Sequence, residues 1–134
     1  MTLGDTPPGA LMAIGGSPSG DLYELPTSLV ELALLEEGWK AKNLGVNLPY
    51  ESFLQAAHDH RANLVWLSAS FIRDQDEFVK QHNRFADSLD EHTVLVVGGR
   101  ALCDELRPKI AHTAYCDNIL QMVDLISMLK FPSH

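Results

Sequence analysis

Small and polar residues are concentrated in one short stretch, Gly15-Gly-Ser-Pro-Ser-Gly20, which is followed by Asp21, Tyr23 and Glu24. Three glycines and two serines within six residues carry almost no apolar surface, so we expect no packing role for them. They suit a loop in which the backbone bends tightly or comes close to a ligand. In a parallel α/β sheet, the loop that leaves the first strand lies at the carboxyl edge, where ligands bind. The stretch therefore predicts a ligand-binding loop.

Two further segments of serine and glycine follow apolar runs. Ser68-Ala-Ser70 comes directly after the run 64–67, and Gly98-Gly99 comes directly after the run 93–97. If these runs are the third and fourth strands of a flavodoxin-like sheet, their exits meet the first loop where the strand order reverses. We therefore expect one wide, smooth groove, lined by serine and glycine.

Residues that could perform catalysis are scattered along the chain. Cys103 and His112 combine a nucleophile with a base, but an amphipathic helix over 101–106 would make Cys103 a packed thiol. His58 and His60 lie two apart on a predicted helix and point to different sides, which does not suit chelation of one metal ion. His82 falls on the apolar face of a helix, where we expect a hydrogen-bonded, partly buried side chain. The pattern predicts a domain that is not an enzyme and has no metal site of its own.

The elements that must position the loops alternate along the chain. Apolar runs predict strands at 10–14, 39–44, 64–67, 93–97 and 111–115. Helical spacing predicts helices that begin at Pro26, near Tyr50 and before Phe78, a short helix over 101–106, and a last helix capped by Asp117. Apolar residues nearly surround the first of these helices, so we expect it to be well buried.

Five strand–helix cycles with short connections predict an α/β fold of three layers. A parallel five-stranded sheet carries helices on both faces, in the flavodoxin-like (Rossmann-like) order. We assign the domain to residues 10–131. Residues 1–9, MTLGDTPPG, have the composition of a linker or a disordered start, which suggests one domain of a longer protein.

The composition limits the classes of partner. A net charge of −8 opposes direct contact with nucleic acid, whose phosphates require clustered lysine and arginine. No apolar run approaches the roughly 18 residues that span a membrane, and the N-terminus lacks a signal-peptide pattern. Two cysteines do not form a disulfide framework. These features predict a cytoplasmic location with reduced thiols.

Four segments in this order resemble cobalamin-binding domains, especially the C-terminal domains of MerR-type light-sensing transcription regulators. Family members carry D-x-H-x-x-G after the first strand, S-x-L after the third and G-G after the fourth. This sequence has Asp21-Leu-Tyr-Glu-Leu-Pro26, Ser68-Ala-Ser70 and Gly98-Gly99 at those places. The segment 37–49 is similar to the family's second strand and its exit. The likeness covers about residues 10–130 and implies a cobalamin-binding-domain architecture.

The same resemblance implies an altered way of holding the cofactor. Tyr23 stands where the family has the histidine that displaces the cofactor's own base and binds cobalt from below. Pro26 replaces the last glycine of that motif, and Ser70 replaces the leucine of S-x-L. Leu22 stands where the light sensors have a tryptophan that helps to cover the upper axial group. The resemblance thus implies cobalamin without histidine ligation, Tyr23 being at most a weak axial ligand, with haem as a second, weaker candidate.

The resemblance also implies which residues line the cofactor. We expect the serine and glycine residues after the third and fourth strands to hold the cofactor's tail by hydroxyl and backbone contacts, and the first loop to form one wall. An alternative role for the tyrosine is an aromatic wedge in the space that the tail would use. The expected binding residues are Ser17, Ser19, Asp21, Leu22, Tyr23, Glu24, Ser68, Ser70, Gly98 and Gly99.

The function implied is that of a non-enzymatic sensor or regulatory domain, part of a transcription regulator. A DNA-binding or helical partner domain would then lie outside this chain. Other hypotheses stay open: a corrinoid carrier for methyl transfer or a mutase, a haem- or flavin-binding module, and a ligand-free domain for dimerisation or interaction. Homodimer formation is open under each of them.

Overall fold

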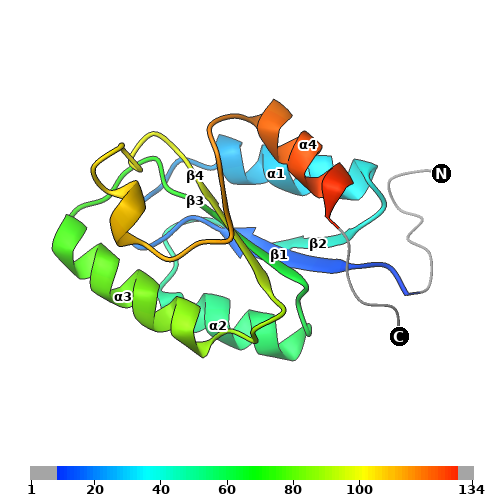
Figure 1. The fold of residues 1–134 in the computed structure, drawn as a ribbon, viewed down its shortest axis with the longest axis horizontal. Coiled ribbons are helices and arrows are strands. Elements are labelled where there is room, and N and C mark those ends of the chain that lie inside the picture. The colour runs from blue at the N-terminus through cyan, green and yellow to red at the C-terminus, as the bar shows by residue number, and fades with distance from the viewer. Residues whose placement is uncertain (1–8, 130–134) are drawn as a thin grey trace.

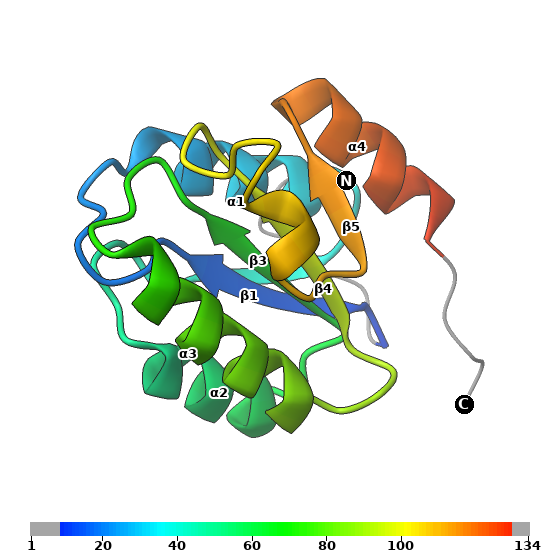
Figure 2. The ribbon, with the colours of Figure 1, turned by 60° about the vertical axis from the view of Figure 1, so that its left-hand side comes forward.

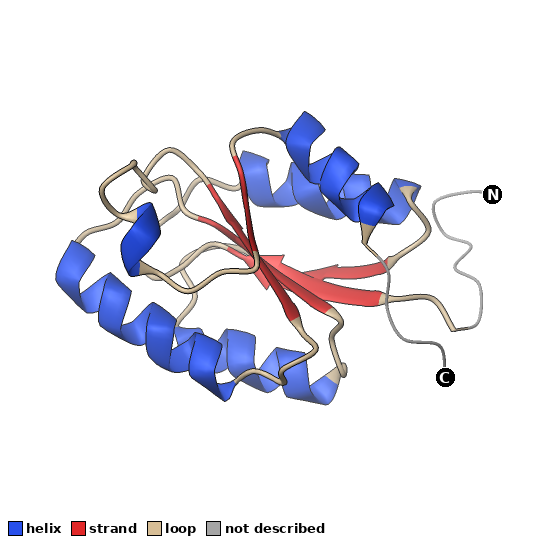
Figure 3. Ribbon diagram, viewed as in Figure 1, coloured by secondary structure: helices blue, strands red, loops and turns tan. Residues whose placement is uncertain are grey.

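The computed structural model describes residues 9–129 and contains one parallel sheet between two layers of helices (Figure 1; Figure 3). The strand order is β2-β1-β3-β4-β5, with every neighbouring pair parallel, so the predicted three-layer, flavodoxin-like α/β fold is confirmed. Helices α2 and α3 cover one face of the sheet and α1 and α4 cover the other, as the turned view of Figure 2 also shows. The elements in chain order are β1 Met12–Gly16, α1 Leu25–Glu36, β2 Lys40–Asn43, α2 Tyr50–Asp59, β3 Leu64–Ser68, α3 Gln75–Ser88, β4 Val94–Gly98, the 3-10 turn η1 Arg107–Lys109, β5 Ala114–Cys116 and α4 Ile119–Met128.

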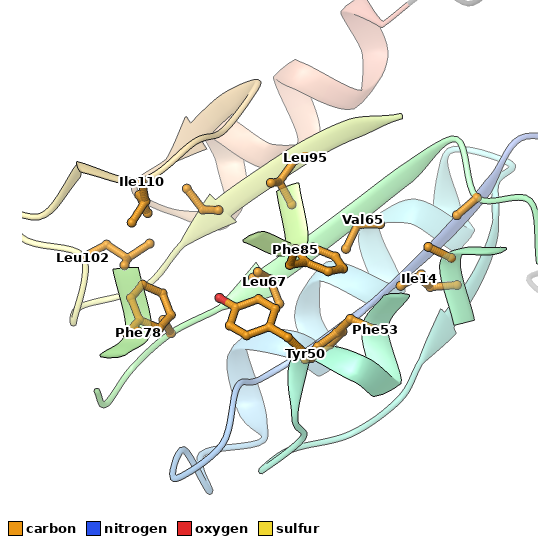
Figure 4. Packing of buried hydrophobic residues seen from close by; sticks show 14 of the residues in the cluster. Ile14, Tyr50, Phe53, Val65, Leu67, Phe78, Phe85, Leu95, Leu102 and Ile110 are labelled. Carbon is orange, nitrogen blue, oxygen red and sulfur yellow. The ribbon is translucent and has the colours of Figure 1, made fainter. Parts of the chain in front are cut away.

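The face under α2 and α3 holds a closed aromatic core (Figure 4). Successive side chains of a strand point to opposite faces, so Val65 and Leu67 of β3 reach this side together. Tyr50 and Phe85 pack with ring centroids 5.1 Å apart at 40°, a tilted arrangement that adds to the stabilisation from burial. The side chains of the sheet, α2 and α3 pack together on this face and hold the strands in place.

His82 is the polar member of this core. It is fully buried, its Nε2–H donates to the Ala111 carbonyl oxygen at 2.6 Å, and its Nδ1 accepts from the Tyr50 hydroxyl at 2.8 Å. This arrangement confirms the predicted hydrogen bonding of His82, although the side chain is fully rather than partly buried, and it requires a neutral imidazole. Burial lowers the pKa of His82 below its ordinary value of 6.5, against a smaller opposing effect of the Ala111 hydrogen bond.

We predict that His82 makes the protein less stable in mild acid. Because the pKa is lower in the folded state, the unfolded chain binds a proton that the folded chain excludes once the pH falls below about 6.5. Urea unfolding between about pH 8 and pH 5 should show a steeper loss of stability for the wild type than for His82→Gln. His58→Gln, on the exposed side of α2, should keep the wild-type slope. Equal slopes for the wild type and His82→Gln would contradict this account.

Two expectations for the first strand and first helix are wrong. Strand β1 begins at Met12 and includes Gly15 and Gly16, which therefore do pack: a Cβ on Gly15 would overlap the Trp66 indole, and one on Gly16 would lie 2.5 Å from the Gly45 carbonyl oxygen. Helix α1 is also not buried all round. Leu25, Leu29 and Leu32 are exposed, although α1 contacts both the sheet and α4.

The segment after β4 also departs from prediction. Residues 101–106 form turns, in which Leu102 N–H donates to Gly99 and Leu106 N–H donates to Cys103, and the short 3-10 turn η1 follows. No continuous ladder of helical hydrogen bonds forms, and Cys103 is exposed where we predicted a packed thiol. Asn118, rather than Asp117, caps α4 by accepting from Gln121 N–H at 2.9 Å.

The limits of the domain lie partly outside the described residues. Of the predicted linker 1–9 the structure describes Gly9 alone, and the last two residues of the predicted domain range are also outside. Within residues 9–129, no helix is both long and apolar enough to cross a membrane.

Candidate functional site

A pocket of about 370 Å³ lies between the sheet and the helices α1 and α4, at the carboxyl ends of β3, β4 and β5. Its floor comes from residues on one face of the sheet: Trp66 and Ser68 of β3, Val96 and Gly98 of β4, and Cys116 of β5. The volume falls within the range of about 300–1,000 Å³ that is usual for small-ligand sites. The opposite face of the sheet is closed by the aromatic core, so the sheet offers this pocket on the α1 and α4 side.

The walls of the pocket are aliphatic. Leu25, Leu29 and Val30 of α1 form one wall, and Ile119 and Met122 of α4 form the other. Leu25 and Leu29, four residues apart, and Ile119 and Met122, three residues apart, are neighbours on one face of their helix. A pocket with this lining favours a flat, apolar group such as an aromatic ring, which gains by leaving water.

The glycine pair 98–99 shapes the pocket at its edge. A Cβ on Gly98 would lie 2.7 Å from the Cys116 carbonyl oxygen, and a Cβ on Gly99, whose φ is +117°, would overlap the Ala69 carbonyl. A side chain at either position would clash with backbone that cannot move aside. The pair therefore allows close packing of β4 against its neighbours and leaves the floor open.

A chain of hydrogen bonds holds the floor in place. The Trp66 indole N–H donates to Thr27 Oγ1 at 2.8 Å, and the Thr27 hydroxyl donates to Asn43 Oδ1 at 3.0 Å. The same Asn43 oxygen accepts from Gly45 N–H at 3.0 Å. These bonds join β3, α1 and β2, so the indole plane cannot turn into the pocket without breaking a buried hydrogen bond.

Asp21 joins the first loop to the exit of β3. Its side chain is 1% exposed. Oδ1 accepts from Tyr23 N–H at 3.0 Å, and Oδ2 accepts from Ser70 N–H at 2.6 Å and Phe71 N–H at 3.3 Å. The carboxylate is thus used inside the protein, and it does not line the pocket. Its structural effect is to bring the predicted loop segments together.

Tyr23 stands at the mouth of the pocket. It follows Asp21 on the first loop, is 46% exposed and lines the pocket. The guanidinium carbon of Arg100, from the loop after β4, lies 5.8 Å from the centre of its ring. The pocket stays open beside the ring, so the tyrosine does not act as a wedge that fills it.

The ten predicted binding residues divide into two groups. The structure brings five of them to the pocket: Tyr23, Ser68, Ser70, Gly98 and Gly99. The other five do not line it.

Each of these five has a different environment. Ser17 is fully buried, with no hydrogen-bond partner for its hydroxyl among the described residues. Ser19 lines a separate cavity of about 200 Å³ beside α3. Leu22 and Glu24 are exposed, and Asp21 is buried as described above. The first loop therefore contributes one side chain of the six that we expected.

The aliphatic lining was missed. Val96 and Met122 have the pattern of ordinary core residues, and Leu29 lies on the helix that we expected to be well buried. The pocket differs from the expected smooth groove of serine and glycine, because its walls are aliphatic. One feature of the sequence indicates the aliphatic wall: α1 has more leucines than a single packed helical face can bury.

Arg107 fixes the end of β5 beside the pocket. Its Nη2 donates to the Tyr115 hydroxyl at 2.7 Å and to Asp117 Oδ1 at 2.9 Å, and its guanidinium carbon lies 3.7 Å from the centre of the Tyr115 ring. Burial, and then the negative charge of Asp117, raise the pKa of the Cys116 thiol. Cys116 is therefore a neutral thiol on the pocket floor.

The sequence is similar to proteins that bind or carry corrinoids. The family model for the B12 binding domain matches residues 12–116. Dimethylamine corrinoid protein 1 of Methanosarcina acetivorans is 24% identical over 116 residues, which cover 82% of this chain and 52% of that protein. Methionine synthase of Mycobacterium leprae is 27% identical over 86 residues, 62% of this chain and 7% of that protein. This chain thus spans about half the length of the corrinoid proteins that it matches.

Solved structures give the same result for the fold. A cobalamin-binding protein from Desulfitobacterium hafniense superposes with a TM-score of 0.76 at 15% identity, covering 89% of this chain and 58% of that chain. The monomethylamine corrinoid protein of Methanosarcina barkeri gives 0.74 at 21% identity, covering 86% of this chain and 56% of that chain. The family model matches most of the described residues, and the solved structures share the fold. The chain therefore belongs to the B12-binding domain family, whose cofactor is cobalamin.

Proposed function

We propose that this domain binds cobalamin with the nucleotide tail in the pocket between α1 and α4, and without a histidine below the cobalt. The observation that carries the proposal is an open, apolar pocket at the carboxyl edge, with Ser68 and Gly98 on its floor and Tyr23 at its mouth. A tail that stayed folded under the corrin ring would leave this pocket unused.

The residues present fit such a tail. The aliphatic walls from α1 and α4 suit an apolar aromatic base. The Ser68 side chain faces the pocket and has no hydrogen-bond partner among the described residues, so it can donate to a polar atom of the tail. The bound group would supply a cobalt centre whose upper ligand can be exchanged or cleaved. The residues of this chain would hold and orient that group and exclude water from the buried base.

Tyr23 is the residue that sets this domain apart in our proposal. We infer that it occupies the place of the family's ligating histidine. A neutral imidazole binds a metal ion directly, whereas a phenol must first lose its proton. The Asp21 carboxylate already accepts hydrogen bonds from three backbone N–H groups, so it is not free to take the proton that the phenol must lose before it binds a metal ion. The cobalt would then lack a nitrogen ligand from the protein.

We infer a sensor or regulatory role rather than group transfer, within a longer protein that supplies a DNA-binding or helical domain. Metal-centred transfer chemistry depends on ligands and their supporting hydrogen bonds, and the tyrosine at the mouth removes that control.

A second candidate, a carrier for methyl transfer, is favoured by the names of the dimethylamine corrinoid relatives. Light scattering on the empty and the adenosylcobalamin-loaded chain separates the two: a change of oligomeric state supports the sensor, and an unchanged mass supports the carrier.

The binding itself is tested by retention on a desalting column. The full chain is mixed separately with hydroxocobalamin, adenosylcobalamin, hemin and FMN. We expect both cobalamins to remain with the protein at a stoichiometric ratio, and hemin and FMN to separate from it. Retention of none of the four would overturn the proposed function and support a ligand-free interaction domain.

The two cysteines provide a local test of where the ligand lies. Cys116 lines the pocket, whereas Cys103 is exposed outside it. We predict that cobalamin slows alkylation of Cys116 by N-ethylmaleimide and leaves the rate at Cys103 unchanged. The reaction is followed by peptide mass spectrometry above neutral pH, because the thiolate is the reactive form. Equal rates at Cys116 with and without bound cobalamin would place the ligand elsewhere.

A further inference from the structure

Arg100 is the one positively charged residue among the described residues that line the pocket. It directly follows Gly98-Gly99 and is exposed at the mouth, opposite the first loop. The chain as a whole carries a net charge of −8. Arg100 is therefore a single cation at the entrance of a largely apolar pocket in an acidic protein.

The backbone around Arg100 is fixed on both sides. Ala69 N–H donates to the Gly98 carbonyl at 2.8 Å, and Ala101 N–H donates to the Ala69 carbonyl at 3.0 Å. Gly99 between them has φ +117°, a conformation that side chains disfavour. These contacts hold the start of the arginine side chain at the mouth and limit where its guanidinium group can reach.

The N–H donors of the Arg100 guanidinium group are not used in an ion pair among the described residues. The group rests 5.8 Å from the Tyr23 ring centre. The acidic residue of the pocket lining, Asp117, is already engaged by Arg107 at 2.9 Å. An aromatic ring orients a guanidinium group without using its N–H donors. Arg100 is therefore ready to bind an anion that enters the pocket mouth.

We propose that Arg100 binds the phosphodiester of the cobalamin nucleotide tail and selects complete corrinoids over those that lack the nucleotide. This inference rests on the proposed function, because it needs the base of the tail in the pocket. The phosphodiester links the corrin side chain to the ribose that carries the base. A base inside the pocket and a corrin ring outside it place this anion at the mouth. Arginine binds phosphate through paired, charge-assisted hydrogen bonds.

The test compares cyanocobalamin with dicyanocobinamide, which has no phosphodiester-linked nucleotide. Both are titrated against the wild type, Arg100→Gln, Arg100→Lys and the control Arg84→Gln, an exposed arginine on α3. We expect Arg100→Gln to weaken cyanocobalamin binding by about tenfold, the lower end for a hydrogen bond to a charged group. Arg100→Lys should fall between, and dicyanocobinamide should bind all four proteins equally. High salt should weaken cyanocobalamin binding to the wild type more than to Arg100→Gln.

The outcomes separate this inference from the proposed function. If the wild type binds neither corrinoid, both fail. If the wild type binds cyanocobalamin and Arg100→Gln binds it equally well, the proposed role of Arg100 is wrong and the proposed function stands. The same holds if Arg100→Gln loses affinity for both corrinoids to the same degree. Melting curves followed by circular dichroism show whether each variant is folded. If Arg100→Gln does not fold, the comparison of Arg100→Lys with the wild type provides the test.

Discussion

Replacing Leu29 with tryptophan is expected to abolish retention of cobalamin while the domain stays folded. Leu29 forms part of the α1 wall of the pocket and is 39% exposed, so an indole has room to extend into the open space. The aromatic base of the tail would then be excluded. Burial of an aromatic group contributes about 2–3 kcal/mol, so its loss corresponds to roughly a 100-fold weaker Kd. Isothermal titration with hydroxocobalamin measures the change.

Leu32→Trp is the matched control for this variant. Leu32 lies on the same helix and is 42% exposed, but it does not line the pocket. It should bind hydroxocobalamin with the wild-type Kd and melt at the wild-type temperature. If Leu29→Trp also kept the wild-type Kd, the tail would not occupy the space between α1 and α4.

Removing the Asp21 carboxylate should cause the largest loss of stability. Asp21→Ala leaves the Tyr23, Ser70 and Phe71 N–H groups without their acceptor in a position that is 1% exposed. An unsatisfied buried donor costs about 1–3 kcal/mol, and partial entry of water reduces the sum, so we expect a loss of about 2–4 kcal/mol in the free energy of unfolding. Urea denaturation followed by tryptophan fluorescence measures it. Cobalamin binding should weaken as well, because the first loop is no longer held against the exit of β3.

Two comparisons show whether this effect comes from the buried hydrogen bonds. Asp21→Asn keeps one side-chain oxygen as an acceptor and should lose less stability than Asp21→Ala. Asp59→Ala removes an exposed carboxylate from the end of α2 and should change the free energy of unfolding by less than about 0.5 kcal/mol. A stability of Asp21→Ala equal to that of Asp59→Ala would show that the carboxylate does not hold the two loops together.

The sequence predicted the framework of the site because the framework follows from local patterns. Alternating strands and helices determine a parallel sheet, and parallel strands bring their carboxyl ends to one edge. Ser68 and Gly98 could therefore be placed at the site from their position after apolar runs. Both residues line the pocket.

The depth of the pocket and the direction of the loop side chains could not be predicted in the same way. Val96 and Met122 have the same apolar spacing whether they touch other core residues or an open space. Asp21 lies in a polar loop, and its burial depends on Ser70 and Phe71, about fifty positions away in the sequence. The need for glycine at position 15 arises from the indole of Trp66 on another strand. Each of these features depends on a contact between distant segments.

We propose that the nucleotide tail leaves the cobalt and that no histidine replaces it. The most direct test is the electron paramagnetic resonance spectrum of bound cob(II)alamin. For the wild type we predict no nitrogen superhyperfine splitting, because neither the cofactor's own base nor the protein supplies a nitrogen ligand to cobalt. Tyr23→His should gain this splitting, and isotopic labelling of histidine nitrogen should change its pattern. Nitrogen splitting in the wild-type spectrum that histidine labelling leaves unchanged would mean that the cofactor's base stays on the cobalt, and would contradict the assignment of the pocket to the tail.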